Sequence, residues 1–314
     1  MSQAPQGTPP GGGEITDGHF VEVSPGIRLH YAQGGDPART PMLFVHGFPE
    51  FWFGWMPLLP RFVDRFHVVA PDLRGFNLSS KPVELSAYKP AALIGDLVAV
   101  IEALGKRKAV VVAHDWGGAL AWGLAIARPD LVERLVILNA PHPVPFARAL
   151  AHDTEQQRAS QYMNWLRSPG SEAALMANDF EQLDGFFRRS GGARWFDAPT
   201  RAAYHRAWGQ PGALACELNY YRASPLYPPS GSDPGAARLT LRDEDFTVRV
   251  PTLVIWGEND TALLPVLLDG LERVVPDLRV ERLPDASHWL IHEQPDAIAA
   301  SIVRFVTGIG HDGA

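Results

Sequence analysis

The stretch "VVVAHDWGGALAW" (Val110–Trp122) decides the fold expected for this chain. Apolar, mostly β-branched residues lead to His114 and Asp115, and two glycines and an alanine-rich helical pattern follow. This order predicts a buried strand that turns sharply into a helix. Asp115 at the junction is open to three interpretations: a helix cap, a nucleotide-binding turn, or the reactive side chain of a nucleophile elbow. Ala113 and Gly117 flank it at the spacing of an elbow, whereas a nucleotide-binding turn would need two further glycines.

Composition is that of an ordinary globular protein. The 314 residues are 46% hydrophobic and 20% charged, with a net charge of −7 and dispersed acids. This pattern disfavours a nucleic-acid partner or a basic membrane-binding face, and no apolar run is long enough to span a membrane. Residues 1–18 have neither a basic start nor an apolar stretch, so they predict a flexible tail rather than a signal peptide. The single cysteine, Cys216, fits a reducing, cytoplasmic location.

The order of apolar runs and helical patterns predicts an α/β fold. Continuous apolar runs between helices are typical of a mostly parallel sheet that is covered by helices on both faces. A hairpin of strands 19–23 and 27–33 is expected around Pro25 and Gly26. Further strands are expected at 41–46, 67–70, 108–113, 135–139, within 250–260 and at 278–283, and helices at 91–104, 117–127, 263–274 and 297–306.

A helical, aromatic-rich segment interrupts this pattern. From 143 to about 248 the chain has helical spacing, with one Pro/Gly/Ser-rich loop, "SPLYPPSGSDPGAA". The expected organisation is therefore a core of residues 19–142 and 249–314, with a helical cap of residues 143–248 inserted over one end of the sheet.

Three residues of complementary chemistry follow predicted strands. Asp115, Asp260 and His288 lie where each strand ends, and ligands of open α/β sheets bind at that edge. Their order in the chain is nucleophile, acid, base, with an aspartate as the nucleophile. An aspartate is ionised at neutral pH without help from a base, which leaves His288 to activate water. As alternatives, Asp260 caps a helix and His288 is a packed loop histidine, with His292 as its rival.

The segment "HGFPEFW" (residues 46–52) follows another strand end. Gly47 permits a close backbone approach. The amides of Phe48 and Trp116 form a predicted oxyanion hole, unless the segment is an ordinary strand exit. We also expect His46 and Pro49 to line the substrate pocket.

The motifs "HGFPEFW", "DLRGFNLSSKP", "HDWGGALAW", "GENDTALL" and "SHWLIHEQP" together resemble the soluble epoxide hydrolases of the α/β-hydrolase superfamily, over residues 19–307. The resemblance implies the α/β-hydrolase fold and two cap tyrosines that hold the epoxide oxygen. "SQYMNWLRSPG" supplies Tyr162, with Trp165 expected in the pocket, and "LNYYRAS" supplies Tyr221. Tyr204 and Tyr220 are the alternative assignments. A phenol stays protonated at neutral pH and can protonate the forming alkoxide.

The resemblance further implies hydrolysis of a small apolar or aryl epoxide by water, through a covalent ester on Asp115, without metal or organic cofactor. Haloacetate and haloalkane dehalogenases share the aspartate nucleophile and remain alternatives. The former use two arginines where this chain has Trp116 and Ala119, and the latter use an asparagine where it has Phe48. A non-catalytic ligand-binding protein is the alternative from another class. Such a protein would need none of the five side chains of the expected mechanism, which are those of Asp115, Asp260, His288, Tyr162 and Tyr221. An esterase is disfavoured because no serine occupies the elbow.

Overall fold

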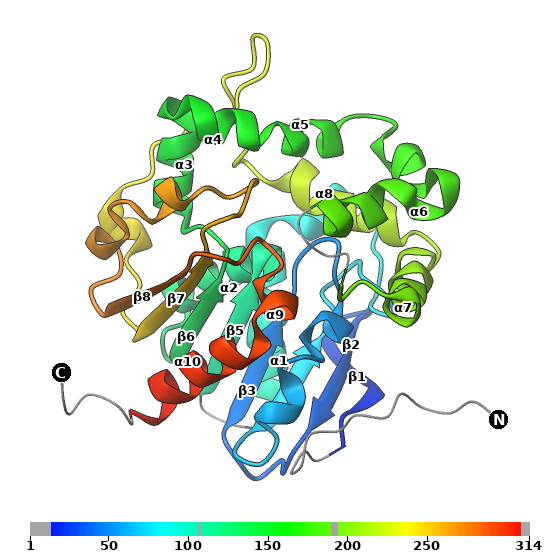
Figure 1. Ribbon diagram of the computed structural model, residues 1–314, viewed down its shortest axis with the longest axis vertical. Coiled ribbons are helices and arrows are strands. Elements are labelled where there is room, and N and C mark those ends of the chain that lie inside the picture. Colours follow the sequence, from blue (N-terminus) through cyan, green and yellow to red (C-terminus); the bar gives the residue numbers. More distant parts are fainter. Residues whose placement is uncertain (1–13, 106–107, 190–193, 309–314) are drawn as a thin grey trace.

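The structure, a computed structural model, describes residues 14–105, 108–189 and 194–308. An eight-stranded sheet runs through the centre of this part of the molecule (Figure 1), in the order β1-β2-β4-β3-β5-β6-β7-β8. The strands are β1 (Thr16–Ser24), β2 (Ile27–Gly34), β3 (Pro41–Val45), β4 (His67–Pro71), β5 (Ala109–His114), β6 (Val132–Leu138), β7 (Thr252–Gly257) and β8 (Leu278–Leu283).

The directions of the strands confirm the expected mostly parallel sheet. β1 and β2 form the predicted antiparallel hairpin, and β2 is also antiparallel to β4. Every neighbouring pair from β4 to β8 is parallel. The carboxyl ends of β3, β5, β6, β7 and β8 therefore meet at one edge, where the loops that follow them can build a common site.

Helices cover both faces of the sheet. The α-helices are α1 (Pro90–Ala103), α2 (Asp115–Ala127), α3 (Pro143–His152), α4 (Thr154–Ala159), α5 (Gln161–Arg167), α6 (Ser171–Arg189), α7 (Ala198–Trp208), α8 (Ala213–Ala223), α9 (Leu290–Glu293) and α10 (Pro295–Thr307). Short 3₁₀ helices are η1 (Trp52–Trp55), η2 (Leu59–Arg61), η3 (Leu85–Tyr88), η4 (Gly235–Arg238), η5 (Asp243–Phe246), η6 (Pro265–Leu268) and η7 (Leu271–Arg273).

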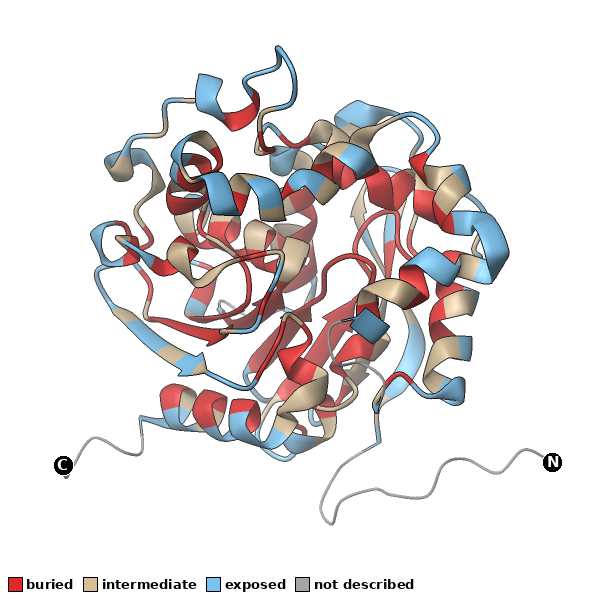
Figure 2. Ribbon diagram, turned by 45° about the horizontal axis from the view of Figure 1, so that its top comes forward, coloured by how far each residue is buried: buried red, intermediate tan, exposed pale blue. Residues whose placement is uncertain are grey.

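β5 shows why the central strands are apolar on both sides. Successive side chains of a strand point to opposite faces. Val111 and Ala113 pack into the cluster that contains α1 and α2, whereas Val110 and Val112 pack into the cluster with α9 and α10. All of β5 is buried, and the centre of the sheet is buried while the outer helix surfaces are exposed (Figure 2).

A helical cap lies over the carboxyl-end edge of the sheet. Helices α3 to α8, together with η4 and η5, come between β6 and β7 in the chain. Of these, α3, α4, α5, α6 and α8 lie together above the strands, and α7 lies at the side (Figure 1). Within the cap, α6 is kinked where residues 177–180 leave helical geometry. α8 is buried on nearly all sides, because it lies between the other cap helices and the core.

Two predictions about local structure are wrong. The helix expected at 263–274 is replaced by η6 and η7. Proline at 265 lacks an amide donor and Gly270 adopts a φ of 76°, so a continuous helix cannot pass through. The expected tail of residues 1–18 is too long, because β1 begins at Thr16, which pairs with Gln33. Residues 1–13 of that predicted tail lie outside the described residues.

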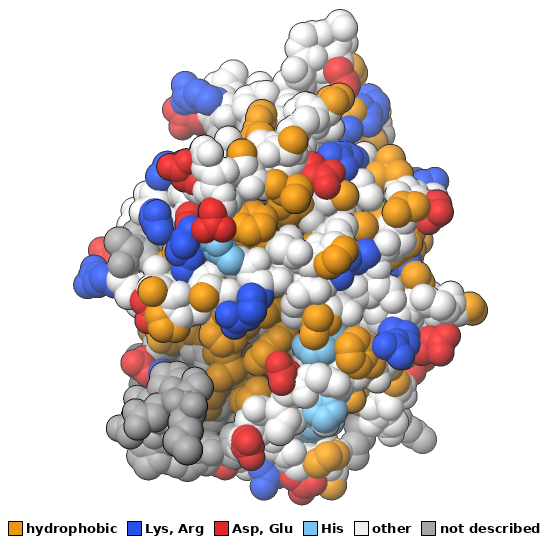
Figure 3. Space-filling view, turned by 90° about the vertical axis from the view of Figure 1, so that its right-hand side faces the viewer, with side chains coloured by type: hydrophobic (Ala, Val, Ile, Leu, Met, Phe, Trp, Pro, Cys, Tyr) orange, Lys and Arg blue, Asp and Glu red, His pale blue; other side chains and the backbone are white. Residues whose placement is uncertain are grey.

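The surface carries both signs of charge. On the face shown in Figure 3, acidic and basic side chains are interspersed rather than gathered into one patch. Among the residues that the structure describes, no helix has the length and apolarity needed to cross a membrane.

Candidate active site

The elbow between β5 and α2 holds Asp115 in a strained backbone conformation. Its φ is 50°, in the left-handed region that side chains other than glycine rarely adopt. The turn is possible because Gly47 and Gly117, which pack closely around it, lack side chains: a Cβ on Gly117 would collide with the carbonyl oxygen of Val45, and one on Gly47 with the carboxylate of Asp115. The residue that caps α2 is His114, whose side chain makes no cap bond. Asp115 is therefore presented to the cavity rather than used as a cap.

The two carboxylate oxygens of Asp115 have different surroundings. Oδ1 accepts a hydrogen bond from the amide of Phe48 at 2.7 Å. Oδ2 lies 3.7 Å from Nε2 of His288, and both side chains keep 12% exposure. One oxygen is thus held by an amide donor of the 46–52 loop, while the other faces the histidine and the cavity.

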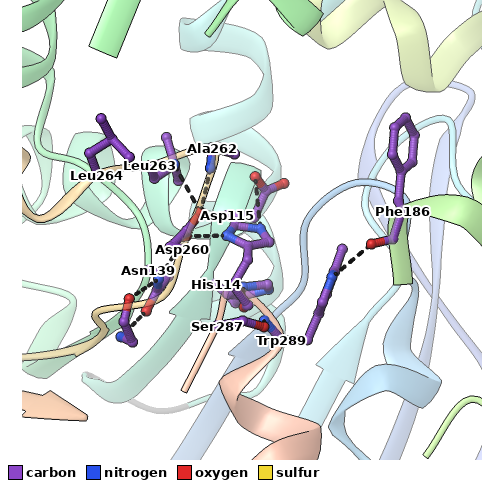
Figure 4. A network of polar contacts seen from close by, with 12 residues as sticks. His114, Asp115, Asn139, Phe186, Asp260, Ala262, Leu263, Leu264, Ser287 and Trp289 are labelled. Carbon is purple, nitrogen blue, oxygen red and sulfur yellow. Dashed lines mark hydrogen bonds and ion pairs between the residues drawn. The ribbon is translucent and has the colours of Figure 1, made fainter. Parts of the chain in front are cut away.

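Asp260 makes the contacts expected from both interpretations of its sequence position, the helix cap and the partner of His288. Oδ1 accepts hydrogen bonds from the amides of Ala262 and Leu263, at 2.8 and 2.9 Å. Oδ2 accepts one from Nδ1 of His288 at 2.7 Å and one from the side-chain amide of Asn139 at 2.7 Å (Figure 4). The same carboxylate therefore caps the turn after β7 and orients the histidine ring.

Asn139 is a site residue that sequence reasoning missed. It follows β6, adopts a φ of 37°, and its side chain also accepts a hydrogen bond from the amide of Gly257 at 2.7 Å. The signal was present, because "VILNAPH" puts a polar residue at the end of a buried strand in the same way as Asp115 and Asp260.

Nearby charges shift the pKa values of both His288 and Asp260, the pair that faces Asp115. Burial alone would favour the neutral forms. The ionised Asp260 and Asp115, with Glu50 behind them, outweigh that burial and raise the pKa of His288 to about 9. In return His288 and the surrounding donors lower the pKa of Asp260 against its burial. In the free protein at neutral pH, His288 is therefore a cation between carboxylates.

A second buried carboxylate, Glu50, lies behind the histidine and links three parts of the chain. Its Oε1 accepts hydrogen bonds from Tyr204 of the cap and from His292 of α9, both at 2.7 Å. Its Oε2 lies 3.4 Å from Nδ1 of His114, whose Nε2 donates to the backbone carbonyl of His288. Despite burial, His292 and His114 hold the pKa of Glu50 well below its ordinary value. His292, which the sequence offered as the alternative to His288, is therefore hydrogen-bonded to Glu50 instead.

The four candidate tyrosines divide into two pairs. The hydroxyl of Tyr204 donates to Glu50, and that of Tyr220 donates to the carbonyl oxygen of Arg74 at 2.9 Å. Tyr162 on α5 and Tyr221 on α8 instead line the cavity above Asp115, with ring centroids 6.3 Å apart. Burial, followed by the nearby Asp115, raises the pKa of both phenols well above 10, so both keep their protons.

Two cavities meet at these residues. A catalytic cavity of about 310 Å³ is lined by Asp260, His288 and Arg189, among others. An apolar cavity of about 380 Å³ extends to the other side, between α2 and the cap. Asp115, Tyr162 and Tyr221 line both. In the part of the chain that the structure describes, no three His, Cys, Asp or Glu side chains are grouped as a metal site would require.

Two of the three predicted pocket residues lie elsewhere. Pro49 lines the catalytic cavity. His46 is fully buried beneath the loop, where its Nε2 accepts a hydrogen bond from the amide of Leu73 and its Nδ1 contacts the carbonyl oxygen of Gly47. Trp165 lines neither cavity, and its side chain is 36% exposed.

Comparisons with known proteins agree with this architecture. Residues 40–295 match the family described as the alpha/beta hydrolase fold. The chain is 34% identical to Epoxide hydrolase 4 of Homo sapiens over 90% of this chain and 76% of that protein. It is 35% identical to the AB hydrolase superfamily protein YfhM of Bacillus subtilis (strain 168), over 91% of this chain and 96% of that protein.

Solved structures give the same result. The epoxide hydrolase of Bacillus megaterium, solved in complex with an inhibitor, superposes with a TM-score of 0.84 and 33% identity, over 92% of this chain and all of that one. The resemblance and the fold inferred from the motifs are thereby confirmed. The chain belongs to the α/β hydrolase fold family and, within it, to the epoxide hydrolases.

Proposed function

We propose that this protein hydrolyses an apolar or aryl epoxide to a vicinal diol through a covalent ester on Asp115. The observation that carries the proposal is a carboxylate at the elbow, set between an amide donor and a histidine–aspartate pair, with two protonated phenols lining the same cavity. A carboxylate is a competent nucleophile toward an epoxide carbon, and the phenols supply the proton that the departing alkoxide needs.

In the first step, Asp115 attacks one ring carbon and the carbon–oxygen bond on that carbon breaks. Tyr162 and Tyr221 donate hydrogen bonds to the epoxide oxygen, and one phenol transfers its proton as negative charge develops there. Such donors stabilise charge best in a site that excludes water. The product of this step is a hydroxyalkyl ester of Asp115.

Ester formation prepares the second step. The ester is neutral, so it removes one of the carboxylate charges that raise the pKa of His288. His288 then releases its proton more readily, which restores the phenol, and takes one from a water molecule. The water attacks the carbonyl carbon of the ester, and the amides of Phe48 and Trp116 are the proposed donors to the oxyanion. The bond between the carbonyl carbon and the substrate oxygen then breaks, and His288 returns its proton to that oxygen, so the diol leaves. The new carboxylic acid of Asp115 gives its proton to His288, which restores the starting state after one water has been added across the epoxide.

A single turnover in H₂¹⁸O tests this path. With protein in excess over styrene oxide, we expect the label in the carboxylate of Asp115 and none in the first diol, because water attacks the ester carbonyl. Label in the diol would mean that water attacks the substrate directly, which would overturn the covalent path.

A parallel assay separates the epoxide reaction from the dehalogenase alternatives. Chloroacetate and a chloroalkane are offered beside styrene oxide, and free halide is followed with diol. We expect diol without halide, and Asp115→Ala as the control should form neither product. Halide without diol would favour a dehalogenase.

A further inference from the structure

Glu217 is a buried carboxylic acid that the proposed reaction leaves without a role. It lies on α8, one helical turn before Tyr221, and is 1% exposed. Among the residues that the structure describes, no donor lies within hydrogen-bond distance of its Oε2. A buried polar atom without a hydrogen-bond partner costs free energy, because it has lost its bonds to water. A carboxyl kept at such a cost calls for a functional explanation.

Its surroundings are the contact between the cap and the core. α8 lies directly on the segment 72–88: a Cβ on Gly75 would come within 3.0 Å of the Cβ of Cys216. The thiol of Cys216 donates to the carbonyl oxygen of Pro82 at 3.6 Å, and Tyr220 is bonded to the carbonyl of Arg74. Because Tyr221 belongs to the same helix, a shift of α8 at this contact also moves Tyr221.

Burial favours the neutral form of Glu217, and the charged and polar groups around it do not reverse this. Asp72 and Lys81 face it from the core, Tyr88 from η3, and Cys216, Tyr220 and Tyr221 from α8 itself. Lys81 is the one cation of this group, and its ammonium is already directed to the carbonyl oxygens of Asn77 and Ser79. Burial, which Lys81 only partly offsets, raises the pKa of Glu217 well above its ordinary value.

We propose that Glu217 is a positioning residue of α8, whose buried side chain, one turn before Tyr221, lets the helix hold Tyr221 against the core, and whose loss of a proton as pH rises slows ring opening. This inference rests on the proposed function, in which Tyr221 donates to the epoxide oxygen. Two effects act in the same direction. An anion at Glu217 would be repelled by Asp72 and would be buried without a hydrogen-bond partner at Oε2, which loosens the helix. It would also make the phenol of Tyr221 a weaker acid.

The test compares wild type with Glu217→Gln, which keeps the shape of the side chain but cannot ionise. The measured quantity is kcat/KM for styrene oxide from neutral to alkaline pH, because it includes ring opening. Once Glu217 titrates, we expect the wild-type value to fall by up to about tenfold per pH unit. That fall should be absent or displaced to higher pH in the variant. Superimposable profiles would overturn the proposal.

Two comparisons separate other causes. A loss that arises from His288 appears equally in both proteins, and Glu181→Gln, the same change at an exposed position of the cap, should retain the wild-type profile. Diol formation by the wild type at neutral pH tests the proposed function itself, so failure of that reaction is distinguishable from failure of this inference.

Thermal unfolding provides a second readout. The pKa of Glu217 is raised in the folded protein, so the unfolded chain loses this proton first as pH rises. Wild-type stability therefore decreases from the ordinary pKa of a glutamate, about 4.3, up to the folded pKa. Because glutamine lacks this titration, the melting temperature of Glu217→Gln should gain on that of wild type across this window. A difference that does not change with pH would show that no buried neutral acid is present.

Discussion

At the scale of single residues, the site depends on side chains whose individual atoms have separate partners. In Asp260, one oxygen accepts backbone amides and the other accepts His288 and Asn139. In Asp115, one oxygen accepts the amide of Phe48 and the other faces His288. The helix-cap and catalytic interpretations are therefore compatible for Asp260. For Asp115, the positive φ is inconsistent with the helix-cap interpretation. Orientation of each carboxylate is what makes the histidine face the nucleophile.

Replacement of Asp260 by asparagine should uncouple the two proposed steps. The amide oxygen of Asp260→Asn can still cap the turn, but a neutral amide no longer stabilises protonated His288. We expect ring opening to continue and ester hydrolysis to slow by about 10²- to 10⁴-fold. Intact mass spectrometry during turnover should then detect protein that carries one added substrate. Asp269→Asn, at an exposed position of the same segment, is the control. Wild-type turnover without accumulation would contradict the role of Asp260.

At the scale of elements, carboxyl ends of parallel strands bring the polar residues together, and cap helices close over them. Glu50 joins these layers, because it follows β3 and bonds both α7 and α9. The indole of Trp208 on α7 donates to the carbonyl of Pro49, and that of Trp289 donates to the carbonyl of Phe186 on α6. Hydrogen bonds across the boundary therefore hold the cap in register with the loop that carries His288.

Glu50→Gln tests this connection through pH. The folded pKa of Glu50 is depressed, so its carboxylate contributes stability above the unfolded pKa, and this contribution is lost as pH falls through the folded pKa. The variant should melt at a lower temperature than wild type at neutral pH, and the difference should shrink in acid. Glu50 also raises the pKa of His288, so the pH profile of ester hydrolysis should move to lower pH. Exposed Glu84→Gln is the control; equal profiles for all three proteins would refute the connection.

At the scale of the whole molecule, the cap and the core enclose two cavities that share the nucleophile and both tyrosines. The apolar cavity is lined mostly by aliphatic, aromatic and proline side chains from α2 and the cap. The catalytic cavity is lined by the triad of Asp115, Asp260 and His288 and by residues of the cap and of the 46–52 loop. Under the proposed function, we expect an epoxide bound at Asp115 to direct one substituent into each cavity, with the larger apolar group in the apolar cavity.

Ala119→Phe fills part of the apolar cavity without touching the triad. Ala119 lines that cavity from α2, four residues after Asp115. We expect kcat/KM for an aryl epoxide to fall by about 10- to 100-fold, from lost contacts and steric exclusion. A small aliphatic epoxide should be hydrolysed nearly as before. Ala159→Phe, in the catalytic cavity, is the reciprocal control and should impair both. Equal losses for both substrates in Ala119→Phe would mean that the aryl group binds elsewhere.

Local pattern in the sequence by itself determined the framework. Strand–helix alternation, the elbow glycines and the positions of Asp115, Asp260 and His288 at strand ends follow from short-range periodicity and turn chemistry. Only the tertiary structure decided which tyrosines reach the cavity, that His292 serves Glu50, that His46 is buried and that Asn139 joins Asp260. The physical reason is that these contacts join residues far apart in the chain. Their formation depends on how the cap docks on the core, and a local sequence pattern contains no information about contacts between such distant segments.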